Sequence, residues 1–227
     1  MPETAARLMR SLGYPFGNPA LLELALTHRS LGAHNNERLE FLGDSLINFL
    51  IGDALYRQQP QAEEGALSRL RASLVREESL ARLARTLDLG EALRLGESEQ
   101  KSGGHRRDSI LADALEAIVG AVYLDGGLPA AQLVCGKLFA QALAELPDAE
   151  SLKDPKTRLQ ERLQAQGRAL PRYEVLEETG PAHQRHFRVS CSLADAELAT
   201  QASAASRRNA EQAAAELMIE KMSVTDA

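Results

Sequence analysis

The chain has 227 residues, of which 44% are apolar and 26% charged, a balance typical of a folded, soluble protein that excludes a disordered or fibrous chain. The net charge of −6 points by itself away from nucleic acid. However, residues 1–150 hold 15 Lys/Arg against 21 Asp/Glu, whereas residues 151–227 hold 11 of each. Only 4% of residues are aromatic and none is Trp, so we expect cores of small aliphatic side chains in close-packed helices.

Met1 is followed by Pro-Glu-Thr rather than by a basic start and an apolar run, so no secretory signal is expected. No stretch reaches the roughly 18 uninterrupted apolar residues that a membrane span needs. Cys135 and Cys191 lie far apart among apolar neighbours, and we interpret them as core residues rather than as a disulfide or a zinc site. We therefore expect a cytoplasmic protein that does not associate with a membrane.

The pattern of residues 1–146 is helical nearly throughout. Asn18 followed by Pro19 is typical of an N-cap with proline at the first helical position. Further on, the apolar periodicity predicts helices over 37–57, 63–87, 108–124 and 128–146, with glycines between several of them. A short polar segment, 148–153, is predicted to be a linker.

The pattern changes from Asp154 onward. Asp154-Pro155 repeats the cap-plus-proline signal and predicts a helix that Gly167 ends. Three strand-like runs follow at 172–178, 186–193 and 196–202, and a last helix is predicted over 206–222. The predicted fold class is mainly α with a C-terminal α+β domain in the order α-β-β-β-α. The two domains span 1–147 and 154–223.

Two groups of acids lie within apolar helical sequence. Glu37, Glu40 and Asp44 follow i, i+3, i+7 spacing and so share one helix face, and Asp113 and Glu116 repeat the i, i+3 spacing. Such acids repel one another unless a cation compensates them. Oxygen ligands from two helices suit Mg²⁺, and a magnesium pair could deliver hydroxide to a phosphodiester. The acids could instead cap helices or pair with arginines, and spacing alone does not name a substrate.

The segment Asn36–Ser45 resembles the signature motif of the ribonuclease III family. The similarity extends over nearly the whole chain and includes residues 26–30, 101–104, 107–113, 153–161 and 206–208. The resemblance implies an all-helical endonuclease domain over 1–147, followed by a double-stranded-RNA-binding domain over 154–223, as in the bacterial type of the family.

The resemblance also assigns roles to the acids by position. Asp44 and Glu116 match the acids most directly tied to catalysis, and Glu37 and Glu64 match two further acids of the cleavage centre. The implied cofactor is Mg²⁺, for which Mn²⁺ can substitute, with no organic cofactor. The residues that match the family's metal-binding carboxylates are Glu40, Asp44, Asp113 and Glu116.

The implied activity is hydrolysis of double-stranded RNA by a homodimer in which each centre cuts one strand, leaving 5′-phosphate, 3′-hydroxyl and two-nucleotide 3′ overhangs. Phe41 matches the residue that inserts into the partner subunit. Processing of ribosomal RNA precursors, with some messenger and transfer RNAs, is the implied role. Two alternatives compete: a non-catalytic dimeric RNA-binding protein, against which the six intact acids argue, and a metal-dependent hydrolase of another substrate, such as a nucleotide, against which the C-terminal domain argues.

Double-stranded-RNA-binding domains read the A-form shape through 2′-hydroxyls and phosphates, largely ignoring sequence. Ala202, Ala204 and Asn209 stand where the family usually has glycine or a basic residue, so we expect weaker phosphate contact there. A neutral domain should also bind RNA with a shallow salt dependence. The residues that match the RNA-contact positions of the family are Thr157, Gln160, Glu161, His183, Ser206, Arg207 and Arg208.

Overall fold

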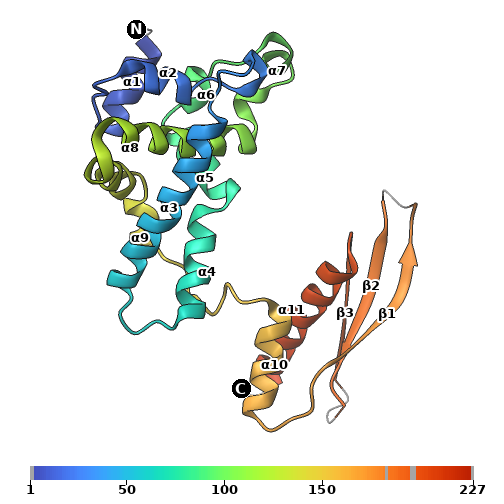
Figure 1. Cartoon of the computed structure of the whole chain (residues 1–227). Helices are drawn as coiled ribbons and strands as arrows, with labels where there is room; N and C mark the ends of the chain where they lie inside the picture. Colours follow the sequence, from blue (N-terminus) through green and yellow to red (C-terminus); the bar gives the residue numbers. More distant parts are fainter. Residues whose placement is uncertain (1–2, 182–183, 195–197, 226–227) are drawn as a thin grey trace. The chain divides into compact units, whose positions relative to one another are not determined.

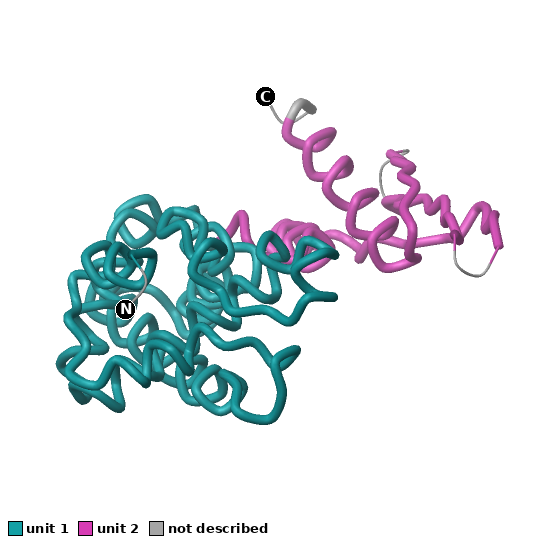
Figure 2. Tube along the Cα trace, turned by 90° about the horizontal axis from the view of Figure 1, so that it is seen from above, with its two compact units in different colours: residues 1–149 teal, residues 150–227 magenta. Residues whose placement is uncertain are grey.

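The computed structural model describes residues 3–181, 184–194 and 198–225, and the chain divides into two units, residues 1–149 (unit 1) and 150–227 (unit 2) (Figure 2). Where the structure describes them, unit 1 is helical, and unit 2 has a three-stranded antiparallel sheet between two helices in sequence. The predicted fold class, mainly α with a C-terminal α-β-β-β-α domain, is confirmed. The helices of unit 1 are α1 (Glu3–Leu12), α2 (Pro19–Ala25), α3 (Glu37–Gln58), α4 (Glu64–Val75), α5 (Glu77–Thr86), α6 (Leu89–Ala92), α7 (Glu97–Lys101), α8 (Asp108–Leu138) and α9 (Ala140–Ala144), with 3-10 turns at Arg29–Leu31 and Gly104–Arg106.

Helix α8 forms the centre of unit 1, packed against α3 and α5 (Figure 1). From Ile110 to Val122 every side chain is buried except those of Asp113 and Glu116, which are half-buried. Among the described helices, α8 alone is long and apolar enough to cross a membrane. Its first half, from Ile110 to Val122, is buried by other helices of unit 1, as suits the centre of a helical core, whereas Leu124, Leu128 and Leu133 of its second half are exposed.

Two glycines allow α3 and α8 to cross with their backbones in contact. A β-carbon on Gly43 would lie 1.8 Å from the carbonyl oxygen of Glu116, and one on Gly120 would lie 2.3 Å from the carbonyl oxygen of Leu39. Neither distance can accommodate a side chain, so both positions require glycine. The crossing places the first turns of α3 against the middle of α8, and these are the segments that carry the predicted acids.

The prediction of one helix over 63–87 is wrong. The chain is extended at Arg76 (φ −65°, ψ 155°), which separates α4 from α5. Helix α4 packs on α3 whereas α5 packs on α8, so the break lets the two helices reach different partners. The Ser79 hydroxyl donates a 2.8 Å hydrogen bond to the carbonyl of Ser73, which replaces a helical bond lost at the break.

The predicted break between the helices 108–124 and 128–146 is present, because Gly127 (φ 74°, ψ −174°) has a non-helical backbone and α8 consists of two helices joined at a kink just before Pro129. The second of these helices ends at Leu138, earlier than predicted. A second break at Phe139, whose side chain is fully buried, then separates α8 from the short α9. Burial of this ring in the core, rather than a glycine or proline, marks the second break.

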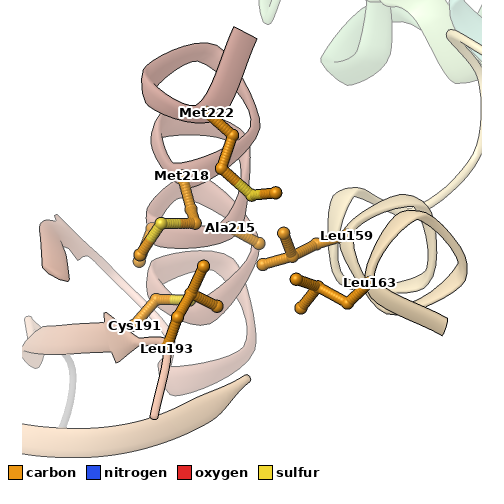
Figure 3. Packing of buried hydrophobic residues seen from close by; sticks show 8 residues of the cluster. Leu159, Leu163, Cys191, Leu193, Ala215, Met218 and Met222 are labelled. Carbon is orange, nitrogen blue, oxygen red and sulfur yellow. The ribbon is translucent and has the colours of Figure 1, made fainter. Parts of the chain in front are cut away.

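Unit 2 packs its two helices and its sheet around one apolar cluster. Leu159 and Leu163 from the first helix meet Met218 and Met222 from the last, and Cys191 closes the cluster from the middle strand (Figure 3). Both cysteines of the chain are buried, as predicted. The elements are α10 (Pro155–Ala165), β1 (Arg172–Thr179), β2 (His186–Ser192), β3 (Ala199–Ala204) and α11 (Arg207–Thr225), with strand order β1-β2-β3.

Candidate metal centre and RNA-binding surface

Three carboxylates converge where α3 crosses α8. Glu40 of α3 and Asp113 and Glu116 of α8 each offer an oxygen, and the three oxygens lie within 4.8 Å of one another. All three side chains are half-buried. The contact at Gly43 lies one turn from Glu40 and directly against the Glu116 backbone, so the close crossing of the helices is what brings the acids together.

The environment opposes ionisation of this cluster. Burial, followed by repulsion from Asp44, Asp113 and Glu40, raises the pKa of Glu116 to about 8. Burial and the neighbouring acids also raise the pKa of Glu40, and burial with the charge of Glu77 raises that of Asp113. Half-buried carboxylates that repel one another are the donor set that a hard divalent cation such as Mg²⁺ fits, because the cation removes the repulsion.

Asp44, the fourth predicted metal ligand, lies beside this trio rather than within it. Its charge is close enough to raise the pKa of Glu116. One of its oxygens, Oδ1, accepts a 2.8 Å hydrogen bond from the side-chain amide of Asn48. The structure therefore brings three of the four predicted ligands together and places the fourth at their edge.

The two further predicted acids lie in different places. Glu37, at the start of α3, lines the same cleft as Glu40, and its carboxylate accepts a 3.0 Å hydrogen bond from Asn35 and pairs with Arg29 at 3.7 Å. Glu64 opens α4, after the far end of α3, and bonds to Ser68 at 2.8 Å. Since α3 has 22 residues, its two ends are about 33 Å apart, so a single chain does not bring Glu64 to the cluster.

The cleft beside the acids also contains groups that the sequence did not single out. Arg107 borders it and pairs with Glu99 at 2.8 Å. His28 caps the short 3-10 turn at Arg29–Leu31, since its Nδ1 accepts the backbone N–H of Ser30 at 3.2 Å. Glu77, whose charge raises the pKa of Asp113, is the first residue of α5, after the break at Arg76 that no sequence signal marked. The residues lining the cleft are His28, Arg29, Asn36, Glu37, Glu40, Glu99, Arg107, Ser109, Ile110 and Asp113.

In unit 2, the predicted contacts of the first helix form one exposed face. Thr157, Gln160 and Glu161 are exposed on α10, at i, i+3 and i+4, while Leu159 and Leu163 face the core. Glu161 accepts a hydrogen bond from the Lys153 ammonium at 2.7 Å. The predicted contact at His183 lies outside the described residues.

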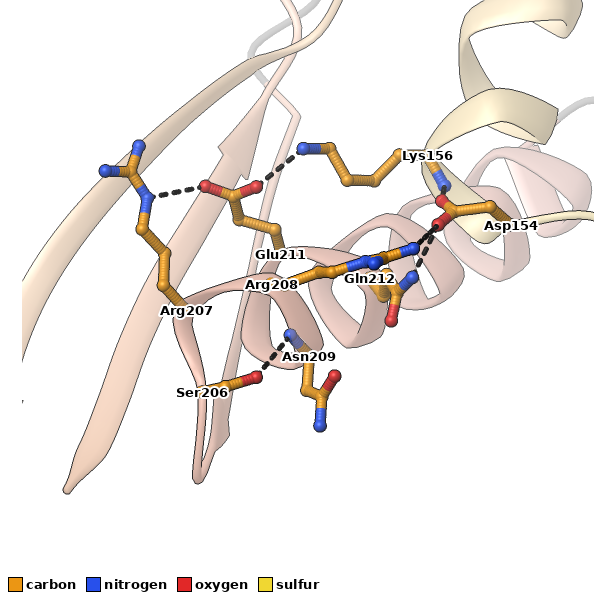
Figure 4. A network of polar contacts seen from close by, with 8 residues as sticks. All are labelled: Asp154, Lys156, Ser206, Arg207, Arg208, Asn209, Glu211 and Gln212. Atoms are coloured by element: carbon orange, nitrogen blue, oxygen red, sulfur yellow. Dashed lines mark hydrogen bonds and ion pairs between the residues drawn. The ribbon is translucent and has the colours of Figure 1, made fainter. Parts of the chain in front are cut away.

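The start of α11 carries the remaining predicted RNA contacts (Figure 4). The Ser206 hydroxyl accepts the N–H of Asn209 at 3.1 Å and so caps the helix, whose first turn bears Arg207 and Arg208 at the positive end of the helix dipole. Both arginines have acidic neighbours that the sequence analysis did not anticipate. Arg207 pairs with Glu211 at 2.8 Å, and Arg208 lies 4.0 Å from Asp154.

Comparisons with known proteins agree with this organisation. A family model described as Ribonuclease-III-like matches residues 18–143, and one described as the double-stranded RNA binding motif matches residues 155–222. The two matches define the class of the protein, a ribonuclease that carries its own RNA-binding module. The predicted linker, residues 148–153, lies between the two matched segments.

The similarity to individual relatives covers almost the whole chain. Ribonuclease 3 of Alkalilimnicola ehrlichii is 55% identical over 98% of this chain and 97% of its own length, and that of Xylella fastidiosa is 54% identical over 96% of each. A solved nuclease domain of ribonuclease III from Campylobacter jejuni is 43% identical with a TM-score of 0.59, covering 60% of this chain and 95% of that domain. The chain belongs to the ribonuclease III family, a family of metal-dependent endoribonucleases, as predicted.

Proposed function

We propose that the protein cuts double-stranded RNA by Mg²⁺-dependent hydrolysis at the Glu40–Asp113–Glu116 cluster. The observation that carries the proposal is the convergence of these three half-buried carboxylates, within 4.8 Å, from two helices. Bound Mg²⁺ would supply an activated water and neutralise charge on the reacting phosphate. The products would be ends with 5′-phosphate and 3′-hydroxyl, offset by two nucleotides at the 3′ side.

The protein's own acids have separable tasks in this proposal. Glu40, Asp113 and Glu116 bind the cation, and Asp44, oriented by Asn48, completes the set from its edge. Without a cation the Glu116 carboxyl holds its proton near neutral pH, because its pKa is about 8. Cation binding would therefore release a proton, so activity should rise with pH through this range.

The proposed working form is a homodimer assembled through α3. Phe41, Phe49 and Tyr56 expose 77%, 58% and 73% of their surface, and their spacing places them within one arc of the helix. Exposed aromatic residues in a row are typical of a protein interface. The Campylobacter jejuni nuclease domain is likewise described as having a region involved in dimer formation.

A dimer also offers a role for Glu64. Because a chain keeps Glu64 at the opposite end of α3 from its own cluster, a contribution to cleavage requires that a second copy bring this acid to the first copy's acids. The proposed substrates are duplex segments of ribosomal RNA precursors and of some messenger and transfer RNAs. The module matched at residues 155–222 would hold these duplexes by their shape.

A labelled perfect RNA duplex tests the proposal. Wild type with Mg²⁺ should give cuts offset by two nucleotides, and a chelator should abolish them. Glu116→Gln should bind the duplex without cutting it, whereas Glu97→Gln, a matched change at a side chain that is 92% exposed on α7, should cut normally. Binding without cutting by wild type in Mg²⁺ would leave only the alternative of a non-catalytic RNA-binding dimer.

A further inference from the structure

A carboxylate lies at the start of α11, where an RNA-binding surface needs positive charge. Glu211 follows Arg207 by one turn, and its side chain is only 11% exposed. Its two oxygens bind two cations, Lys156 Nζ at 2.6 Å and Arg207 Nε at 2.8 Å (Figure 4). Because Lys156 belongs to α10, the carboxylate ties the two helices of unit 2 together at the RNA-facing end of α11.

Glu211 is held on the side away from Arg207. The ammonium of Lys156 lies 4.6 Å from the centre of the Tyr173 ring in β1, so that cation is itself fixed between a ring and a carboxylate. Burial would raise the pKa of Glu211, but the bonds from Lys156 and Arg207 lower it below its ordinary value. The carboxylate is therefore ionised at neutral pH and has a fixed orientation.

The bond to Glu211 uses only one of the three nitrogens of Arg207. Figure 4 shows the two terminal nitrogens pointing away from Glu211, and the Arg207 side chain is 64% exposed. Among the described residues, neither terminal nitrogen has a hydrogen bond or ion pair. A guanidinium held by Nε presents two parallel N–H groups, the geometry that matches two oxygens of one phosphate.

We propose that Glu211 is a positioning residue for RNA binding, which holds Arg207 by Nε so that both terminal nitrogens face one phosphate of the duplex. The inference deepens the proposed function, because it rests on Arg207 meeting RNA. A fixed arginine loses less side-chain freedom on binding than a mobile one, so the pairing favours affinity although it reduces the net charge. A carboxylate without this role would only repel RNA. The two roles predict opposite signs when Glu211 is removed.

A double-mutant cycle on the full chain tests the inference. Binding of a perfect RNA duplex is measured in chelator, which prevents cleavage, for wild type, Glu211→Ala, Arg207→Ala and the double variant. Each single change should raise Kd by roughly five- to tenfold, as expected for the loss of one charge-assisted contact. Once Arg207 has been replaced, the further change Glu211→Ala should leave Kd unaltered. Glu216→Ala is the control, since its 3.0 Å pair with Arg158 also joins α10 to α11, and its Kd should stay that of wild type.

Tighter binding by Glu211→Ala would overturn the inference, because the carboxylate would then act only by repulsion. Additive losses in the double variant would overturn it as well. An unchanged Kd for Arg207→Ala would rule out a contact between Arg207 and phosphate. The proposed nuclease activity would not be affected by that result, because the cleavage test with Glu116→Gln measures it separately. Should Glu211→Ala fail to fold by its melting curve, Glu211→Gln replaces it: its amide oxygen can still accept from Nε, so the expected Kd lies between those of wild type and Arg207→Ala.

Discussion

The stability of the metal-free protein should depend on pH through Glu116. The pKa of this carboxyl is raised from 4.5 to about 8 by burial and by the neighbouring acids, so the fold favours its neutral form. The stabilising effect of the neutral form is fully present below pH 4.5 and is lost as the pH rises to about 8. Without screening, this shift would correspond to about 5 kcal/mol, but because water reaches the half-buried group we expect about 2 kcal/mol.

Replacing Glu116 with Gln should remove most of this loss, since glutamine keeps the shape and has no charge. The loss is measured by urea unfolding in chelator at about pH 5 and about pH 8.5, which gives the free energy of unfolding of wild type, Glu116→Gln and the exposed control Glu97→Gln. Wild type and the control should lose stability across this interval, whereas Glu116→Gln should lose much less. Adding Mg²⁺ at the higher pH should restore wild type and leave Glu116→Gln less affected, because the ionised acids bind the cation.

Equal pH dependence in wild type and Glu116→Gln would refute the argument that this carboxyl is forced into a repulsive cluster. Stability at the higher pH that does not respond to Mg²⁺ would refute the cation site even if the pH dependence were present. The pH dependence therefore tests the repulsion among the acids, and the response to Mg²⁺ tests whether they bind a cation.

Three further changes test the crossing, the interface and the N-terminal packing. Gly43→Ala should destabilise the protein by roughly 1–3 kcal/mol in urea unfolding and abolish cleavage, because its methyl group meets the Glu116 carbonyl; wild-type stability would contradict the close crossing. If the proposed homodimer forms through α3, Phe41→Asp should shift it toward monomer in sedimentation velocity, and an unchanged dimer would exclude this face of α3 as the interface. Asp125→Asn should lower the melting temperature, because its carboxylate accepts bonds from the Tyr14 hydroxyl and the N–H groups of Gly17 and Asn18, each at 2.8 Å; an unaltered melting curve would make these bonds dispensable.

Sequence predicts elements of this fold well where the signal is local. The side chains of Asn18 and Asp154 accept the N–H groups of Ala20 and Lys156, so both predicted caps are present, and Gly167 adopts the left-handed conformation that ends α10 (φ 67°). The break at Arg76 could not be predicted because no glycine or proline marks it. It exists because α4 and α5 pack on different helices, which is a property of the assembled core.

The site could be predicted only in part for the same reason. Spacing along each helix puts Glu37 and Glu40 on one face and Asp113 and Glu116 on another, but spacing does not say that the two faces meet. Their meeting depends on two glycines, at 43 and 120, whose importance lies in the atoms opposite them. The family resemblance indicated which acids to consider. Only the fold shows that Asp44 lies beside the Glu40–Asp113–Glu116 cluster and that Glu64 lies far from it.

The net charge of −6 is compatible with binding a polyanion because the acidic side chains have different surroundings in the two units. In the proposed mechanism, RNA approaches the acids of unit 1 only when a divalent cation offsets their negative charge, so metal binding and RNA binding there should favour each other. In unit 2, Glu211 of α11 and Asp154, which precedes α10, lie beside cationic side chains: Glu211 bonds to Lys156 and Arg207, and Asp154 lies 4.0 Å from Arg208. Glu211 and Asp154 thus lower the total charge yet leave the outward guanidinium of Arg207 directed at solvent, where a phosphate can meet it. On this proposal, affinity for the duplex depends on the direction in which the cationic side chains point as well as on their number.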